Sequence, residues 1–107
     1  MLVQIEASNL IKKYGQKITI SKSGQAIKSS AFIQPLRADE QSELYGDYNQ
    51  NQVEQYLYIG LPDCEIDDSG NTTVIFDNEN YSVVKSESVW LSNKIIYTRA
   101  VLEKQQD

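Results

Sequence analysis

The densest run of apolar side chains lies mid-chain, in Gln55-Tyr56-Leu57-Tyr58-Ile59-Gly60-Leu61-Pro62. Its residues favour extended backbone, with the two tyrosines on one face of a strand and Leu57 and Ile59 on the other. Large side chains on both faces predict a central strand that is covered on both sides. Gly60 and Pro62 are expected to end it, because proline cannot donate a hydrogen bond to a strand ladder.

The first residues have a different, helical spacing. Apolar side chains recur on one side of a helix at Val3, Ala7, Leu10, Ile11 and Tyr14. Two lysines then precede a glycine at position 15, which suits the C-terminal end of a helix. The pattern predicts a short amphipathic helix over 2–14, whose apolar stripe either covers the protein's own sheet or docks onto a partner subunit.

The rest of the chain is dominated by strand signals. Residues 17–36 alternate apolar and polar side chains around Ser23-Gly24 and predict a β-hairpin, and residues 55–102 predict a β-meander of short strands separated by turns. A polar tail over 103–107 follows. The expected fold is mainly β: one domain over 1–107, a small antiparallel β-sandwich or barrel with a short N-terminal helix.

Residues 38–54 interrupt this pattern and predict an acidic loop. The segment is polar, poor in β-branched residues and long for a connection in so small a domain, and long loops are often functional. Its apolar side chains are interpreted as contact residues for this domain or a neighbour. With two lysines of the helix they form the predicted interface: Asp39, Glu40, Glu43, Leu44, Tyr45, Asp47, Tyr48, Lys12 and Lys13.

The formal net charge of −5 hides an uneven distribution. Residues 1–37 carry six Lys and Arg against one acidic residue, whereas residues 38–84 carry eleven Asp and Glu and no Lys or Arg. One interpretation is that the acidic loops lie on a solvated face. The other is that a basic surface of one copy meets an acidic surface of the next, since such complementarity orients partners.

Composition excludes several kinds of chemistry. The chain has one cysteine, Cys64, and no histidine, so an intrachain disulfide framework, a cysteine-rich zinc site and histidine-based catalysis are excluded. Asp63, Glu65 and Asp67 alternate like calcium ligands, but the glycine and glutamate that an EF-hand loop requires are missing. No catalytic, cofactor or metal site is therefore predicted. The absence of a signal-peptide pattern or a long apolar segment predicts a soluble protein made inside the cell.

Aromatic residues are frequent in the predicted strands, which is also typical of a platform for single-stranded nucleic acid. Such a platform needs a basic groove, and most of these aromatics lie within the segment that lacks Lys and Arg. Core packing is the better interpretation for most of them, and no specific nucleic-acid partner is expected.

Several segments, taken in order, resemble one protein family. They are 10–16 (LIKKYGQ), 18–20 (ITI), 31–36 (AFIQPL), 56–62 (YLYIGLP), 81–84 (YSVV) with Glu87, and 97–102 (YTRAVL). Together they resemble the small head–tail joining proteins, or neck and connector proteins, of prophages in Gram-positive bacteria. The resemblance spans nearly the whole chain, although each segment alone is weakly specific.

The resemblance implies a non-enzymatic virion structural protein without cofactors. It would act at the head–tail junction as a connector or head-completion subunit, with portal or adaptor-ring and tail proteins as partners, and it could self-associate into a ring. It would be found in the virion, and in the host cytoplasm during assembly. A minor tail subunit and a small acidic regulator that binds proteins by mimicking DNA remain as alternatives.

Overall fold

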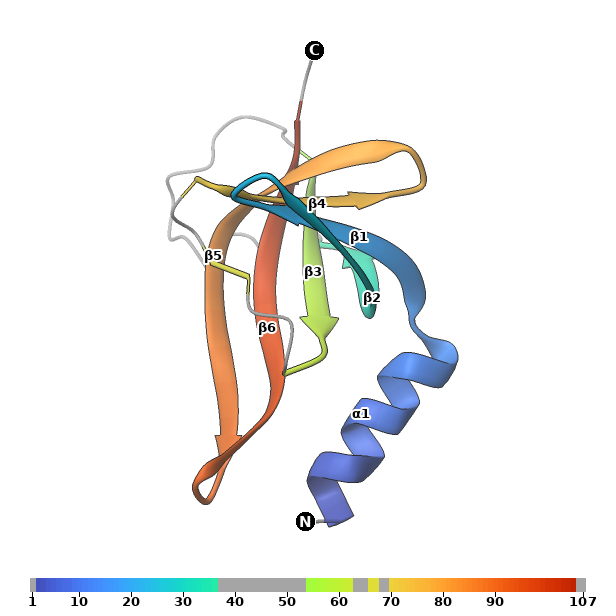
Figure 1. The fold of residues 1–107 in the computed structure, drawn as a ribbon, viewed down its shortest axis with the longest axis vertical. Coiled ribbons are helices and arrows are strands. Elements are labelled where there is room, and N and C mark those ends of the chain that lie inside the picture. Colours follow the sequence, from blue (N-terminus) through green and yellow to red (C-terminus); the bar gives the residue numbers. More distant parts are fainter. Residues whose placement is uncertain (1, 37–53, 63–65, 68–69, 106–107) are drawn as a thin grey trace.

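Six strands and one helix make up the described part of the protein, a computed structural model that describes residues 2–36, 54–62, 66–67 and 70–105, with side chains from Ala7 onward (Figure 1). All strand pairings are antiparallel, and the sheet closes into a barrel in the order β1-β2-β3-β6-β5-β4. The expected mainly β fold with a short N-terminal helix is confirmed. The elements are α1 (Leu2–Tyr14), β1 (Gln16–Lys22), β2 (Gln25–Pro35), β3 (Gln55–Gly60), β4 (Thr72–Phe76), β5 (Glu79–Leu91) and β6 (Lys94–Lys104).

Two-residue turns connect neighbouring strands at three points. Ser23 and Gly24 both have positive φ angles, 51° and 84°, and so do Asp77 and Asn78, at 53° and 63°. Two successive positive φ values are typical of the turns whose twist matches that of the flanking strands. The third turn joins β5 to β6, with Ser92 at a φ of 57°. These turns fix the register of the hairpins that they close.

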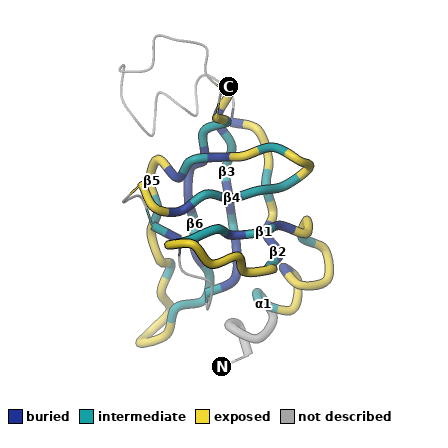
Figure 2. The backbone as a smooth tube through the Cα atoms, turned by 45° about the horizontal axis from the view of Figure 1, so that its top comes forward, coloured by how far each residue is buried: buried dark blue, intermediate teal, exposed yellow. Residues whose placement is uncertain are grey.

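Buried residues are spread along the strands of the barrel (Figure 2), and most of them form one hydrophobic core cluster. Ile18 and Ile20 of β1 point inward because they alternate with polar residues, as the hairpin pattern predicted. The buried cluster comprises Ile18, Ile20, Ala31, Tyr58, Ile66, Val74, Tyr81, Val83, Ala100 and Leu102. Every strand therefore contributes at least one side chain, and the sheet has one covered inner face.

The central strand β3 lies between β2 and β6. Tyr58 is fully buried on its inner face, but Leu57 and Ile59 on the outer face are only half-buried, so the second face is less covered than predicted. The strand ends at Gly60, where a Cβ atom would overlap the Tyr58 ring. Glycine is thus required here for space.

The meander predicted over 55–102 is wrong in its connections. β3 pairs with β6 and not with β4, the next strand in the chain, whereas β4, β5 and β6 do follow one another. Closing the barrel requires this arrangement, because β4 pairs with β1 on its other side. Strand spacing predicted short strands separated by turns, but not these partners.

The helix α1 has the predicted span and packs against β2 and β6. The amide of Gly15 donates a hydrogen bond of 2.9 Å to the carbonyl of Ile11, which closes the helix as expected. The apolar positions of the helix differ in burial: Ile11 is 2% exposed and covers the protein's own sheet, whereas Leu10 is 51% and Tyr14 63% exposed. The chain enters β1 directly after Gly15, so the junction fixes the helix rotation and turns only a narrow line inward.

Candidate functional site

The structure places two of the predicted interface residues. Lys12 and Lys13 are exposed in the last turn of α1, where a positive charge is favourable against the helix dipole. The other seven, Asp39, Glu40, Glu43, Leu44, Tyr45, Asp47 and Tyr48, lie outside the described residues, as does Cys64.

Four exposed lysines lie on the last turn of α1 and on the first hairpin: Lys12, Lys13, Lys17 and Lys28, here called the lysine face. Lys17 points outward because it alternates with the buried Ile18. Lys28 is on the same face, since it is opposite Thr19 and its Nζ is 3.5 Å from the Thr19 Oγ1. All four are exposed, and none forms an ion pair with another described residue.

Two exposed aromatic side chains accompany the lysine face. Tyr14 is 63% exposed, and the Nζ of Lys13 lies 5.3 Å from its ring centroid. Phe32 is 37% exposed on the outer side of β2, because its neighbour Ala31 is buried in the core. The strands β1 and β2 contain no Asp or Glu at all. This surface therefore combines apolar area with lysines that form no ion pair with another described residue.

Carboxylates gather elsewhere, around Lys104 near the end of β6. Its Nζ is 3.4 Å from a carboxylate oxygen of Glu54 and 3.7 Å from one of Glu79. These charges, Glu54 foremost and then Glu79, raise the pKa of Lys104. Glu103, the neighbour of Lys104 in β6, instead accepts a hydrogen bond of 3.4 Å from the Gln55 Nε2. We call Glu54 and Glu79, the two carboxylates paired with Lys104, the acidic rim.

Three aromatic rings lie next to this rim. The rings of Phe76 and Tyr81 stack at 4.6 Å between centroids, and that of Tyr56 meets Tyr81 edge-on at 5.2 Å. Burial, with contributions from Tyr56 and the rim carboxylates, raises the pKa of Tyr81 to about 12. Tyr81 belongs to the core and the other two pack against it, as predicted for most of the aromatics. The rim thus borders a partly buried apolar surface.

A third surface is the two-stranded ribbon of residues 89–97. Within the described part of the chain, β5 pairs with β4 only as far as Ser82, and β6 pairs with β3 only from Thr98 onward. Between these two points the strands β5 and β6 pair only with each other. The ribbon therefore continues past the closed barrel (Figure 1). Trp90 and Leu91 at its tip are 59% and 39% exposed. The end of the hairpin presents large apolar side chains to solvent.

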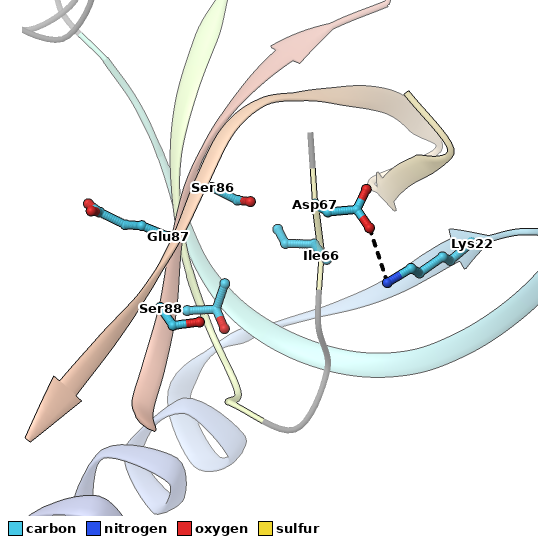
Figure 3. A pocket seen from close by; sticks show the side chains of 7 residues that line it. Lys22, Ile66, Asp67, Ser86, Glu87 and Ser88 are labelled. Carbon is cyan, nitrogen blue, oxygen red and sulfur yellow. Dashed lines mark ion pairs between the residues drawn. The ribbon is translucent and has the colours of Figure 1, made fainter. Parts of the chain in front are cut away.

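A polar cavity of about 260 Å³ opens between β5 and the end of β1. Its lining is Lys22, Ile66, Asp67, Ser86, Glu87, Ser88 and Thr98. Figure 3 shows Lys22 directed toward Asp67, with Nζ and Oδ2 3.2 Å apart, while Glu87 points away from the cavity. Glu87 binds Arg99 at 2.8 Å. Both carboxylates are thus held by cations, and the cavity offers hydrogen-bonding groups to a small polar moiety.

Asp63, Glu65 and Asp67 alternate in the sequence like calcium ligands, but the described residues do not form a set of metal ligands. Asp67 accepts a hydrogen bond from Thr72, at 3.3 Å, besides its ion pair with Lys22. Among the described residues, no group of three or more Cys, Asp or Glu side chains is arranged to hold a metal ion. No helix within the described ranges is long and apolar enough to span a membrane.

Sequence reasoning missed most of these groupings. The signal that could have predicted the ribbon tip is the apolar pair Trp90-Leu91 next to the turn at Ser92-Asn93. The clustering of Lys17 with Lys28 follows from register, which the hairpin turn at Ser23-Gly24 could have supplied. No local sequence pattern predicts the cavity, because its lining residues come from β1, β5, β6 and residues 66–67, which are separated in the sequence.

Known proteins add no further guide to the site: comparisons with protein-family models, with curated proteins and with solved structures found no match to this chain.

Proposed function

We propose that this chain is a non-enzymatic structural subunit of a phage or prophage particle that acts at the head–tail junction, as a connector or head-completion subunit. Its partners would be other particle proteins, namely the portal or adaptor ring and the tail proteins. The proposal rests on the ordered resemblance of segments from 10–16 to 97–102. It is supported by features of the fold that suit assembly.

The structural observation that supports the proposal most directly is the exposed tip of the β5–β6 ribbon. A two-stranded ribbon is only marginally stable in water, and this one exposes Trp90 and Leu91 at its end. Tryptophan is enriched among the residues that dominate binding energy in protein interfaces. A projecting apolar tip is expected to be covered by a neighbouring protein in an assembled particle.

The direct test is electron microscopy of particles produced by an induced lysogen from which the gene has been deleted. Full heads without attached tails are expected, because the joining step would fail. Particles of normal appearance would contradict the proposal, and normal heads with missing or malformed tails would favour the alternative of a minor tail subunit.

Complementation of the deletion then tests the ribbon tip. Trp90→Ser is expected to leave the protein folded but to reduce the yield of tailed particles. Ile27→Ser is the matched control, since Ile27 is 39% exposed and lies near the turn of the other hairpin. Equal yields of tailed particles from the two variants would show that the ribbon tip has no special role in assembly.

A further inference from the structure

The edge of β5 that faces away from β6 is unpaired over the second half of the strand. β4 pairs with β5 only as far as Ser82, and no described strand other than β6 pairs with β5 from Val83 to Leu91. Every second residue of such an edge directs its N–H and C=O groups away from the sheet, where they can pair with another extended chain. β5 contains no proline or glycine, and its ladder with β6 is regular from Lys85 to Val89. The free edge is therefore a continuous row of hydrogen-bonding groups.

The polar cavity borders this free edge. Three successive residues of β5 line it, namely Ser86, Glu87 and Ser88. Successive side chains of a strand point to opposite faces, and Figure 3 shows the Glu87 side chain directed away from the cavity, so Glu87 contributes its main chain to the lining. Lys22, the last residue of β1, lies on the other side of the cavity in its ion pair with Asp67. The cavity thus lies beside the backbone of β5.

The lining of the cavity suits an uncharged polar side chain. Ser86, Ser88 and Thr98 supply hydroxyl groups, which both donate and accept hydrogen bonds. Lys22 and Asp67 neutralise each other at 3.2 Å, so a charged group would find no opposite charge left for it there. The volume of about 260 Å³ is far above the roughly 10–15 Å³ that one water molecule requires, and it leaves room for a side chain.

We infer that the free edge of β5 binds an extended segment of a partner protein as an added strand, and that the cavity holds a serine, threonine, asparagine or glutamine side chain of that segment. In this mode of recognition, main-chain hydrogen bonds supply affinity and pockets for alternate side chains supply specificity. The inference rests on the proposed function in one respect, that the β5–β6 ribbon is a protein-binding surface. It goes further by naming the chemistry of the bound segment.

The exposed tryptophan extends the same binding surface toward the ribbon tip. Strand alternation places Trp90 on the same face of β5 as Ser86 and Ser88. An added strand that places a polar side chain in the cavity therefore has an apolar side chain, two or more positions further along, against the Trp90 ring. We expect the bound segment to combine one uncharged polar residue with one apolar residue on the same face.

Peptides supply the probe for this site. A library of random peptides about ten residues long, the upper length of ordinary strands, is selected against the purified protein. Binding of the selected peptides is then measured by fluorescence anisotropy. Ser88→Phe places a large ring at the cavity from an exposed position and should weaken binding on the order of tenfold or more. The matched control is Lys85→Phe, which places the same ring on the opposite face of β5 and should bind within about twofold of the wild type.

Backbone pairing is tested without any change to the protein. N-methyl groups on alternate residues remove the amides along one edge of a bound peptide, and N-methyl groups on the intervening residues remove those along the other edge. One series should lose binding on the order of tenfold or more, and the other should retain it. Hydrogen exchange of the main-chain amides of residues 85–89 should also slow when the unmodified peptide binds.

Four results would overturn the inference. The first is a selection that yields no peptide with affinity for the protein. The second is equal binding by the wild type and a folded Ser88→Phe variant, and the third is an equal effect of the two N-methyl series. The fourth is a wild type that dimerises without peptide and slows exchange at residues 85–89, which would assign the edge to a second copy. Particle assembly is not read in any of these measurements, so their failure leaves the proposed function to its own test.

Discussion

Replacing Gly15 with alanine should destabilise the protein, although the same change stabilises many others. Gly15 is the only residue between α1 and β1, and its amide donates to the Ile11 carbonyl. A Cβ atom at this position would lie 2.5 Å from the Ile11 oxygen and 3.1 Å from the backbone nitrogen and carbon of Ala31. All three atoms belong to backbone, so no side-chain rotation can relieve the overlap. The helix would have to move away from β2.

Two opposing effects set the size of the change in the free energy of unfolding that Gly15→Ala causes. Overpacking typically costs about 1–3 kcal/mol, while the reduced entropy of the unfolded chain returns about 0.4–1 kcal/mol when glycine becomes alanine. The overlap with Ile11 and Ala31 places Gly15 toward the upper part of the first range. We expect the free energy of unfolding to fall by about 1–2 kcal/mol, which lowers the Tm of a domain of this size by roughly 4–8 °C for each kcal/mol.

Urea unfolding followed by far-ultraviolet circular dichroism measures this change. Trp90 fluorescence is a poor probe, because the side chain is already largely exposed in the folded protein. Ser8→Ala is the control: Ser8 lies in α1 and is half-buried, and its replacement should change stability by a few tenths of a kcal/mol. A Gly15→Ala protein as stable as the wild type, or more stable, would refute the close approach of the junction to β2.

Three further predictions concern the core, the aromatic cluster and the ribbon. Leu102→Ala removes a fully buried side chain and should lower the free energy of unfolding by about 2–5 kcal/mol, measured by urea titration; a loss below about 1 kcal/mol would contradict its place in the core. The pKa of Tyr81 is raised from 10.0 to about 12, so its contribution to stability is present below pH 10 and is lost as the pH rises toward 12. Urea titrations across this range should show a steeper decline for the wild type than for Tyr81→Phe, and parallel curves would contradict the shift. Trp90→Ser should change the free energy of unfolding by less than about 0.5 kcal/mol, because the side chain is 59% exposed; a large loss in thermal unfolding would show that Trp90 packs within the fold.

Local patterns in the sequence predicted several elements of the structure. The helical spacing up to Tyr14, followed by Gly15, matches α1 and its closing hydrogen bond. Ile18 and Ile20 alternate with polar residues and point into the barrel, as a half-buried strand requires. These features depend on the geometry of a few neighbouring residues, and that geometry is the same in any fold.

Sequence patterns predicted less about the candidate surfaces. Lys12 and Lys13 were predicted from their place at the helix end, but Lys17 and Lys28 join them only through strand register. The ribbon tip is exposed because β4 pairs with β5 only as far as Ser82. Neither fact follows from periodicity within a segment. The exposure of Leu10 and Tyr14 likewise depends on how the junction at Gly15 meets β2.

By itself, the sequence determined the helix, the alternation of the strands, the turn at Ser23-Gly24 and the uneven distribution of charge. Only the tertiary structure decided that β3 pairs with β6 and that β1 closes the barrel against β4. The physical reason is that pairing between distant strands depends on covering one shared core and satisfying both edges of every strand. The grouping of the lysines, the carboxylates around Lys104 and the apolar ribbon tip follows from that closure.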